Sequence, residues 1–319
     1  MATLETIGER RLIERMLSVC RPRQGATTVI GPGDDAAVIG GLSDGRIAAT
    51  TDSVSVARHK TPGMNWEQFG WTAAAVNFSD LAAMGARPVG LLAAMDMPGD
   101  MEEADFLDIA SGIDQCCEFC GTEVVGGDTK PGPGTVTATA LGSFEGRKPL
   151  TRSGARPGDV VAVTGCIGEA AAGFLAEQNS LEGFDDAEFA FRVPVPRWEE
   201  GMAMAGTGIV TSCMDLSDGL GNACRAVCAA SHAGMEIEWE FLPLGEDTEE
   251  VCRLCRKDLR ETALRWGGDY ELLFTFDPKD IDALYKAGVA FSIIGSVDNG
   301  RGAFIAEGGE RREMPDGIY

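Results

Sequence analysis

Residues 66–95 read "WEQFGWTAAAVNFSDLAAMGARPVGLLAAM", an apolar segment that is interrupted by a glycine and a proline and then resumes. Apolar side chains recur at helical spacing as far as residue 84, so the first part predicts a helix. Asp80 falls on the apolar face that Phe69 and Ala73 share. A carboxylate on such a face is costly to bury unless it is paired or bound to a cation. The alternative is a helix turned by one residue, with Asp80 facing solvent.

Further strands and helices are predicted on both sides of this segment. A first half contains a strand at 46–56, this helix, a second helix at 101–120 and an alternating strand at 135–144. A turn-rich, basic stretch at 145–159 separates it from a second half. That half contains strands at 160–165, 208–215, 235–241, 271–276 and 291–297, helices at 168–177 and 218–231, and a polar connection at 178–191. We therefore predict an α+β protein of two α/β domains, residues 1–148 and 149–319.

The composition narrows the classes of partner. The chain has 319 residues and a formal net charge of −23. Such a negative field repels nucleic acid and anionic membranes, so we expect neither as a partner. No apolar run reaches the roughly 20 residues that a membrane helix needs, and we expect a cytoplasmic protein. Solubility or adaptation to salt would also explain the acidity. The other explanation is that some acids cluster to bind divalent cations.

The ten cysteines include C-x-x-C pairs within 116–120 and at 252–255. Such pairs can bind zinc, but these two lie far apart and neither has a histidine nearby. Cys224 and Cys228 have the spacing of a helical apolar stripe. The pattern therefore favours reduced, packed thiols over a metal site or disulfides.

Acidic residues recur at strand ends, in glycine turns and at helix starts. They are Asp35 in "GPGDD", Asp52 in "TTDS", Asp128 in "VVGGDT", and Asp215 and Asp218 in "DLSDG". Ordinary turn chemistry or helix capping would explain each one taken singly. Taken together with Asp80, they provide the hard oxygen ligands that Mg²⁺ requires. Magnesium in turn indicates a polyphosphate, because an acidic site can hold such an anion only through bridging cations.

Glycine-rich segments at 126–135 and 164–173 could contact phosphates through backbone N–H groups. Neither is a Walker A loop or a complete dinucleotide fingerprint. Nucleophilic catalysis is poorly supported, since His59 and His232 are the only histidines.

Seven segments, in order along the chain, resemble the thiamine-monophosphate kinase family. They are "GDDAAVI" (33–39), "TTDS" (50–53), "VNFSDLAAMGARP" (76–88), "VVGGDT" (124–129), "LTRSGARPGD" (150–159), "DLSDGL" (215–220) and "GGDYELLF" (267–274). That family belongs to the superfamily of aminoimidazole ribonucleotide synthetase. The resemblance implies two α/β domains and a homodimer formed through the N-terminal domains. It also implies direct in-line phosphorylation of thiamine monophosphate to the diphosphate, with ATP and several Mg²⁺ ions.

The resemblance assigns roles to individual positions. The metal-binding positions are matched by Asp35, Thr50, Thr51, Asp52, Asp80, Asp128, Asp215 and Asp218. The nucleotide contacts are matched by Gly127, Asp128, Arg152 and Ser217. Of these, Asp128, Arg152 and Asp218 are expected to act in the transfer itself. His59 matches a substrate contact, and Gly268 and Ile318 stand at two further substrate-side positions.

The departures from the family also fall on the substrate side. The family usually reads Gly-Gly-Glu-Asp before "YELLF", whereas this chain reads Trp266-Gly267-Gly268-Asp269. Ile318 stands near an expected aromatic residue, and Lys60 follows His59 where an aromatic is common. Two alternatives therefore stay open. One is a sister ATP-dependent enzyme that acts on another small acceptor, and the other is a nucleotide-binding protein without turnover.

Overall fold

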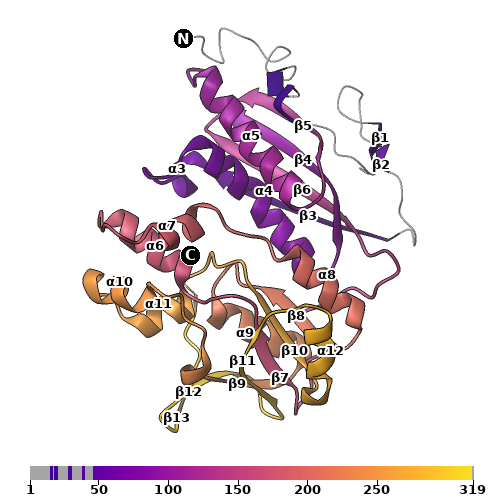
Figure 1. The fold of residues 1–319 in the computed structure, drawn as a ribbon, viewed down its shortest axis with the longest axis vertical. Coiled ribbons are helices and arrows are strands. Elements are labelled where there is room, and N and C mark those ends of the chain that lie inside the picture. Colours follow the sequence, from indigo (N-terminus) through magenta and orange to yellow (C-terminus); the bar gives the residue numbers. More distant parts are fainter. Residues whose placement is uncertain (1–14, 17, 21–27, 31–37, 40–45, 318–319) are drawn as a thin grey trace. The chain divides into compact units, whose positions relative to one another are not determined.

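The structure is a computed structural model that describes residues 15–16, 18–20, 28–30, 38–39 and 46–317 (Figure 1). The chain forms two compact units. The first comprises residues 1–81 and 87–146, and the second comprises residues 82–86 and 147–319. The sequence places its division between 148 and 149, whereas the contacts divide the chain after 146 and assign the short segment 82–86 to the second unit. The two units are described separately below.

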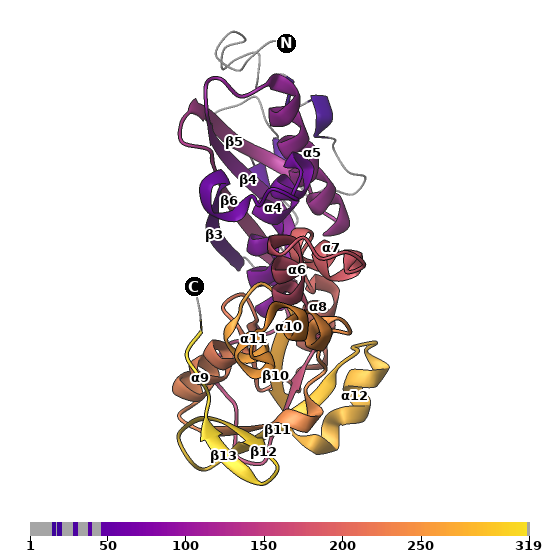
Figure 2. The same cartoon turned by 90° about the vertical axis from the view of Figure 1, so that its left-hand side faces the viewer.

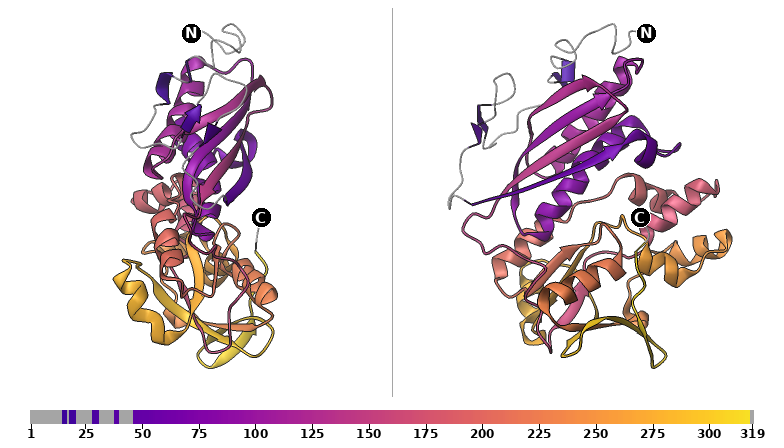
Figure 3. Two further views of the ribbon diagram at one scale, coloured as in Figure 1. Left: turned by 90° about the vertical axis from the view of Figure 1, so that its right-hand side faces the viewer. Right: turned by 180° about the vertical axis from the view of Figure 1, so that it is seen from behind.

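The first unit is a four-stranded sheet with two long helices on one face (Figure 3). The strand order is β3-β6-β4-β5, formed by β3 (Ile47–Ser55), β6 (Thr135–Ser143), β4 (Arg87–Met97) and β5 (Val124–Pro131). The helices are α4 (Trp66–Ala83) and α5 (Glu103–Phe119), and the short α3 (Val56–His59) follows β3. A separate antiparallel pair joins β1 (Thr28–Ile30) and β2 (Val38–Ile39). The predicted helix at 66–84 is thus confirmed.

The two faces of this sheet differ in burial, as the alternation in β6 predicts. Val136, Ala138 and Ala140 are fully buried on the helix side. Thr137 and Thr139 lie between them on the opposite side and are only half-buried. Because side chains alternate across a strand, these residues point to the second side, which none of the described helices covers and which we call the open face.

The second unit is built on a seven-stranded sheet of order β13-β12-β9-β11-β7-β10-β8. Its strands are β7 (Val160–Val163), β8 (Ser212–Asp215), β9 (Gly234–Glu238), β10 (Leu272–Phe276), β11 (Ser292–Asp298), β12 (Gly302–Glu307) and β13 (Glu310–Glu313). Its helices are α6 (Glu169–Gln178), α7 (Asp185–Arg192), α8 (Trp198–Thr207), α9 (Leu220–Ser231), α10 (Thr248–Cys255), α11 (Leu259–Arg265) and α12 (Ile281–Lys286), with 3₁₀ turns η1 (Trp239–Phe241) and η2 (Pro278–Asp280).

Both faces of this sheet are covered, and α9 and α12 lie on opposite sides of it (Figure 2). Val161, Val163 and Leu273 pack into one core with α9 and α11. Ala162 and Phe274 pack into the other core with α8 and α12. A strand buried on both faces reads as a continuous apolar run, which explains why "ELLFTF" lacks alternation. The α+β prediction with two α/β parts is confirmed.

One element prediction is wrong. The polar connection expected at 178–191 contains α7, which packs against α6. Its first turn carries Asp185 and Asp186 and its last carries Arg192, charges that suit the helix dipole. Only Ala187 is fully buried, so the segment reads as polar although one side of it is packed. No helix in the described part of the chain is long and apolar enough to cross a membrane.

Candidate active site

Three predicted metal positions meet in the first unit where β3 lies against α4. The Thr50 hydroxyl donates to a carboxylate oxygen of Asp80 at 2.5 Å. The backbone N–H of Asp52 donates to the side-chain oxygen of Asn77 at 2.9 Å. Asn77 and Asp80 lie one turn apart on α4, so one face of this helix fixes both β3 positions. Asp80 is half-buried and hydrogen-bonded, as the cost of burying a carboxylate requires.

Asn77 is a residue that the sequence interpretation missed. It is fully buried, and its amide also donates to the Ala73 carbonyl at 3.1 Å. The sequence pattern that could have indicated Asn77 is its position in the apolar run "AAVNFSD". A buried amide there needs hydrogen-bond partners for both its oxygen and its nitrogen. We assign it the role of holding Asp52 in place.

Asp128 lies on the other face of the same sheet. The register aligns Asp128 with Ala94, Thr137 and Ser53 across the strands, whereas Asp52 aligns with Gly127. Thr51 also belongs to the open face, where Thr139 donates to its hydroxyl at 2.9 Å. Asp128 pairs with Lys130 at 2.6 Å, and this hydrogen bond lowers the pKa of its carboxyl. The carboxylate of Asp128 therefore points away from Asp52 and Asp80 within one chain.

Gly127 is required by packing. A Cβ atom there would lie 1.8 Å from the Ala93 carbonyl oxygen on β4, a distance that no real side chain tolerates. The glycine therefore allows β5 to lie close to β4 immediately before Asp128. Asp35 lies outside the described residues. Among those described, no three histidine, cysteine, aspartate or glutamate side chains form a group that could hold a metal ion.

In the second unit, three segments meet at one end of the strands of the sheet. There β7 and β8 end and the antiparallel β10 begins. Asp215, the last residue of β8, is buried, and the Ser217 hydroxyl donates to it at 3.2 Å. Asp218 is exposed, and its carboxylate makes no hydrogen bond or ion pair within the described residues. Helix α9 starts after Gly219, and no side chain caps it. The capping role considered for Ser217 and Asp218 is therefore wrong.

The segment before β10 lies directly against this loop. The Gly268 N–H donates to the Ser217 carbonyl at 2.9 Å. A Cβ on Gly267 would lie 2.1 Å from the same carbonyl oxygen. Gly268 itself has φ of +94°, the left-handed region that disfavours other residues. A glutamate at this position would be strained, so the backbone of this loop accounts for a glycine here in place of the family's carboxylate.

The start of α6 is occupied by a carboxylate of the protein itself. Asp269 accepts from the N–H groups of Gly168 at 2.9 Å and Ala170 at 3.2 Å. A helix start attracts one anion, and here Asp269 supplies it. We therefore do not expect the glycine-rich segment at 164–173 to bind a phosphate at this helix start. Burial raises the pKa of the Asp269 carboxyl to about 7.

This raised pKa predicts a pH-dependent contribution to stability. The folded pKa of about 7 exceeds the ordinary value of 3.8, so protonated Asp269 stabilises the fold at low pH, and that contribution is lost as the pH rises through about 7. We expect the free energy of unfolding of the wild type, relative to Asp269→Asn, to fall between pH 5.5 and 8. Urea unfolding at several pH values measures this difference. A difference that stays constant over this range would contradict the assignment.

A buried ion pair supports the same edge and was also missed from the sequence. Arg197 donates two hydrogen bonds to the Glu271 carboxylate, at 2.7 and 2.5 Å. The Thr164 hydroxyl donates to Glu271 at 2.6 Å and accepts from the Leu272 N–H at 2.8 Å. These bonds join β7, β10 and the chain before α8. No local pattern marks Arg197, because its partner lies 74 residues away.

The remaining predicted site positions are Arg152, His59 and Ile318. Arg152 is exposed, and its guanidinium makes no bond within the described residues, while its carbonyl accepts from Ser231 at 3.3 Å. His59 ends α3, its Nδ1 lies 2.9 Å from the Ser55 N–H, and partial burial lowers its pKa. Ile318 lies outside the described residues. The preceding Gly317 lies beside Asp218, since a Cβ there would be 2.8 Å from the Asp218 carbonyl.

Seven of the ten cysteines are buried, as expected for packed thiols. All ten cysteines are free thiols. Burial raises the pKa of Cys213 and Cys224, and of Cys116 within the first C-x-x-C region. Buried thiols with raised pKa values are inert packing groups.

Comparison with known proteins identifies relatives of the whole chain. The family descriptions "AIR synthase related protein, N-terminal domain" and "AIR synthase related protein, C-terminal domain" match residues 33–144 and 156–307. A thiamine-monophosphate kinase of Escherichia coli O157:H7 is 35% identical over 91% of this chain and 90% of its own length. The crystal structure of thiamine-monophosphate kinase from Stenotrophomonas maltophilia K279a matches with a TM-score of 0.81 and 28% identity, covering 94% of this chain and 95% of that one. A structure of AaThiL complexed with AMPPCP and TMP matches with a TM-score of 0.76 and 26% identity, over 99% and 98% of the two chains.

Proposed function

This chain belongs to the AIR synthase related protein family in both of its domains, and we propose that it is a thiamine-phosphate kinase. It transfers a phosphoryl group from ATP to thiamine monophosphate and forms thiamine diphosphate. The single observation that carries the proposal is the alignment with a thiamine-monophosphate kinase over nine tenths of both chains. The AaThiL structure with an ATP analogue and TMP supports the same pair of substrates.

The chemistry of this reaction fits the residues at the site. The nucleophile is an oxygen of the acceptor's own phosphate, so no covalent enzyme intermediate and no strong general base are needed. The protein has to bring two anions together in line, which is a problem of positioning and charge neutralisation. The exposed Arg152 guanidinium offers directional hydrogen-bond donors to phosphate oxygens. His59, whose pKa is lowered, acts near pH 7 as an uncharged hydrogen-bonding contact for the acceptor.

Magnesium fits the donor set, which consists of carboxylate and hydroxyl oxygens. In the first unit, Asp52 and Asp80 with the Thr50 hydroxyl would hold it on one side of β3. Asp128 would bind a separate cation on the open face. In the second unit, Asp215 and the neighbouring Asp218 would bind a further cation. Cations bound at these places would neutralise phosphate charge and polarise the transferring group.

We further propose a homodimer that forms through the open face of the β3-β6-β4-β5 sheet. That face carries small polar side chains such as Ser53, Thr137 and Thr139, which allow close packing against a second sheet. Sedimentation at twice the chain mass of 33.6 kDa would check the dimer. A cytoplasmic location accords with ten free thiols and with the use of ATP.

The function is tested by incubating the purified protein with ATP, Mg²⁺ and thiamine monophosphate. We expect thiamine diphosphate and ADP in equal amounts, loss of turnover on chelation of Mg²⁺, and recovery when Mg²⁺ is restored. ATP consumption only with another small acceptor would indicate a sister enzyme. Tight Mg²⁺–ATP binding without transfer to any acceptor would indicate a nucleotide-binding protein, and either result would refute the proposal.

A further inference from the structure

Three aromatic side chains gather beside the candidate site of the second unit. The rings of Trp266 and Phe174 lie with centroids 5.0 Å apart, and those of Phe174 and Phe191 lie 5.4 Å apart. All three residues are half-buried, so parts of their rings remain accessible. We call Trp266, Phe174 and Phe191 the aromatic face. It joins the segment before β10 to α6 and α7.

The aromatic face is continuous with the loop that carries Asp218. The Trp266 carbonyl oxygen would lie 2.7 Å from a Cβ on Gly219, and two residues later Gly268 is hydrogen-bonded to Ser217. The segment 266–268 therefore lies along the loop 217–219.

There is room beside Gly268 on the same side of α6. A Cβ on Gly268 would contact only the Ala170 side chain, at 3.7 Å. Ala170 and Phe174 are four residues apart on α6 and so share one helix face. Gly268 lies beside Ala170, and Trp266 lies beside Phe174. The surface thus offers an open position next to a wall of aromatic rings.

The charges around this surface suit a cation. Asp218 is exposed and unpaired within the described residues. Glu169, in the first turn of α6, is half-buried and makes no ion pair with a described residue. Aromatic faces bind quaternary nitrogen cations through the electron-rich surface of the ring. A flat organic cation therefore fits both the shape and the charge of the aromatic face.

We propose that Trp266 and Phe174 bind the flat, positively charged organic part of the phosphorylated acceptor and determine its specificity. This inference rests on the proposed function, which supplies an acceptor with a thiazolium ring. It gives this chain a means of acceptor recognition that does not use a carboxylate at position 268. Trp266 acts in binding and takes no part in phosphoryl transfer.

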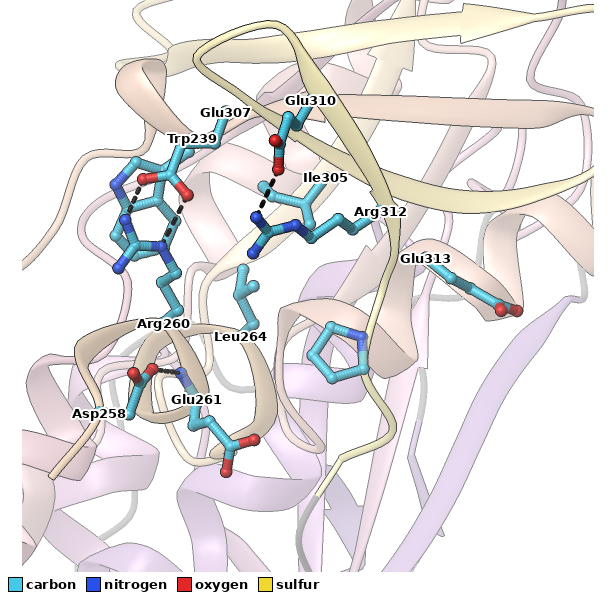
Figure 4. A pocket seen from close by; sticks show the side chains of 11 residues that line it. Trp239, Asp258, Arg260, Glu261, Leu264, Ile305, Glu307, Glu310, Arg312 and Glu313 are labelled. Carbon is cyan, nitrogen blue, oxygen red and sulfur yellow. Dashed lines mark hydrogen bonds and ion pairs between the residues drawn. The ribbon is translucent and has the colours of Figure 1, made fainter.

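The control is Trp239, another tryptophan of the second unit. Trp239 lines a separate pocket of about 320 Å³ together with Leu264 and Ile305 (Figure 4). Its ring is covered by the Arg260 guanidinium, 5.2 Å from the ring centroid, and Arg260 is itself paired with Glu307 (Figure 4). Because a protein cation already covers this ring, we expect Trp239 to contribute nothing to acceptor binding.

The kinetic test compares Trp266→Ala, Trp266→Phe and Trp239→Phe. We expect Trp266→Ala to raise KM for thiamine monophosphate about tenfold, with KM for ATP and kcat changed less than about twofold. Trp266→Phe should keep most of the affinity, because it keeps an aromatic ring, and Trp239→Phe should match the wild type. An unchanged KM for thiamine monophosphate in Trp266→Ala, or an equal rise in KM for ATP, would overturn the proposal.

A binding measurement separates this proposal from the proposed function. Thiamine monophosphate titrated into the protein without ATP should quench tryptophan fluorescence in the wild type and in Trp239→Phe, but not in Trp266→Phe. This readout keeps the test valid if Trp266→Ala does not fold. Binding with Trp266-dependent quenching but no phosphoryl transfer would refute the kinase and keep the aromatic face. Transfer without any change in Trp266 fluorescence would refute the aromatic face and keep the kinase.

Discussion

Replacing Asp218 with asparagine (Asp218→Asn) is expected to lower kcat for thiamine diphosphate formation by about 10²–10³-fold, with little change in the free energy of unfolding. Asp218 is exposed and its carboxylate makes no bond within the described residues, and it caps no helix. Its charge therefore has no structural role in the described part of the chain. Asp218 would act on the reacting phosphates through a bound cation, and losing a group that stabilises the transition state in this way typically has an effect of this size. Steady-state kinetics at several Mg²⁺ concentrations measure it.

The matched control for this prediction is Asp282→Asn. Asp282 is likewise exposed and lies in the first turn of α12, a part of the second unit with no predicted site residue. We expect wild-type kinetics from it, and a change in the unfolding free energy within about 0.5 kcal/mol for both variants. If Asp218→Asn keeps wild-type turnover at every Mg²⁺ concentration, Asp218 neither binds the metal nor acts in the transfer.

Arg197→Met is expected to reduce the free energy of unfolding by about 3 kcal/mol, at the lower end of the range for broken buried ion pairs. The Glu271 side chain is only 6% exposed, so the variant leaves a buried carboxylate without its cation. The lower end applies because the Arg197 side chain is 29% exposed and water can partly replace it. Urea unfolding followed by circular dichroism measures the loss.

Arg253→Met is the control for this second prediction. Arg253 also makes a two-bond ion pair, with Glu250, but the two side chains are 65% and 49% exposed. Exposed pairs contribute little, so we expect the free energy of unfolding of this variant to match that of the wild type. Equal losses in the two variants would mean that the pair of Arg197 and Glu271 has no special role in holding β7, β10 and α8 together.

The sequence predicted those elements that carry a clear periodicity of their own, and it made no prediction for helices α8, α10, α11 and α12 or for strands β12 and β13. Helix α4 and strand β6 were both predicted from local spacing, within one residue of their observed ends. Helix α7 was missed because only one of its residues is fully buried, so its pattern is mostly polar. The spacing of apolar residues along the sequence indicates which side of a helix or strand is buried. It does not reveal an element that buries few residues.

The candidate site was predictable as a set of residues but not as an arrangement. Asp80 stood out because a carboxylate on an apolar helix face needs a partner, and the structure supplies Thr50. That Asp52 and Asp128 lie on opposite faces of one sheet follows only from the strand register. In the sequence, Gly268 stands where the family usually has a glutamate. Its positive φ shows that a residue with a side chain would be strained at this position. Conformation and register of this kind depend on contacts between distant segments.

By itself the sequence determined the family, through short contiguous motifs, and the two α/β parts, through the alternation of strands and helices. It also singled out the acidic residues that we propose bind magnesium. Only the tertiary structure showed that Asn77 holds Asp52, that Asp269 occupies the start of α6, and that Trp266 lies on Phe174. Each of these pairs is separated by tens of residues along the chain. The chain brings such groups together only by packing, so no local pattern can specify them.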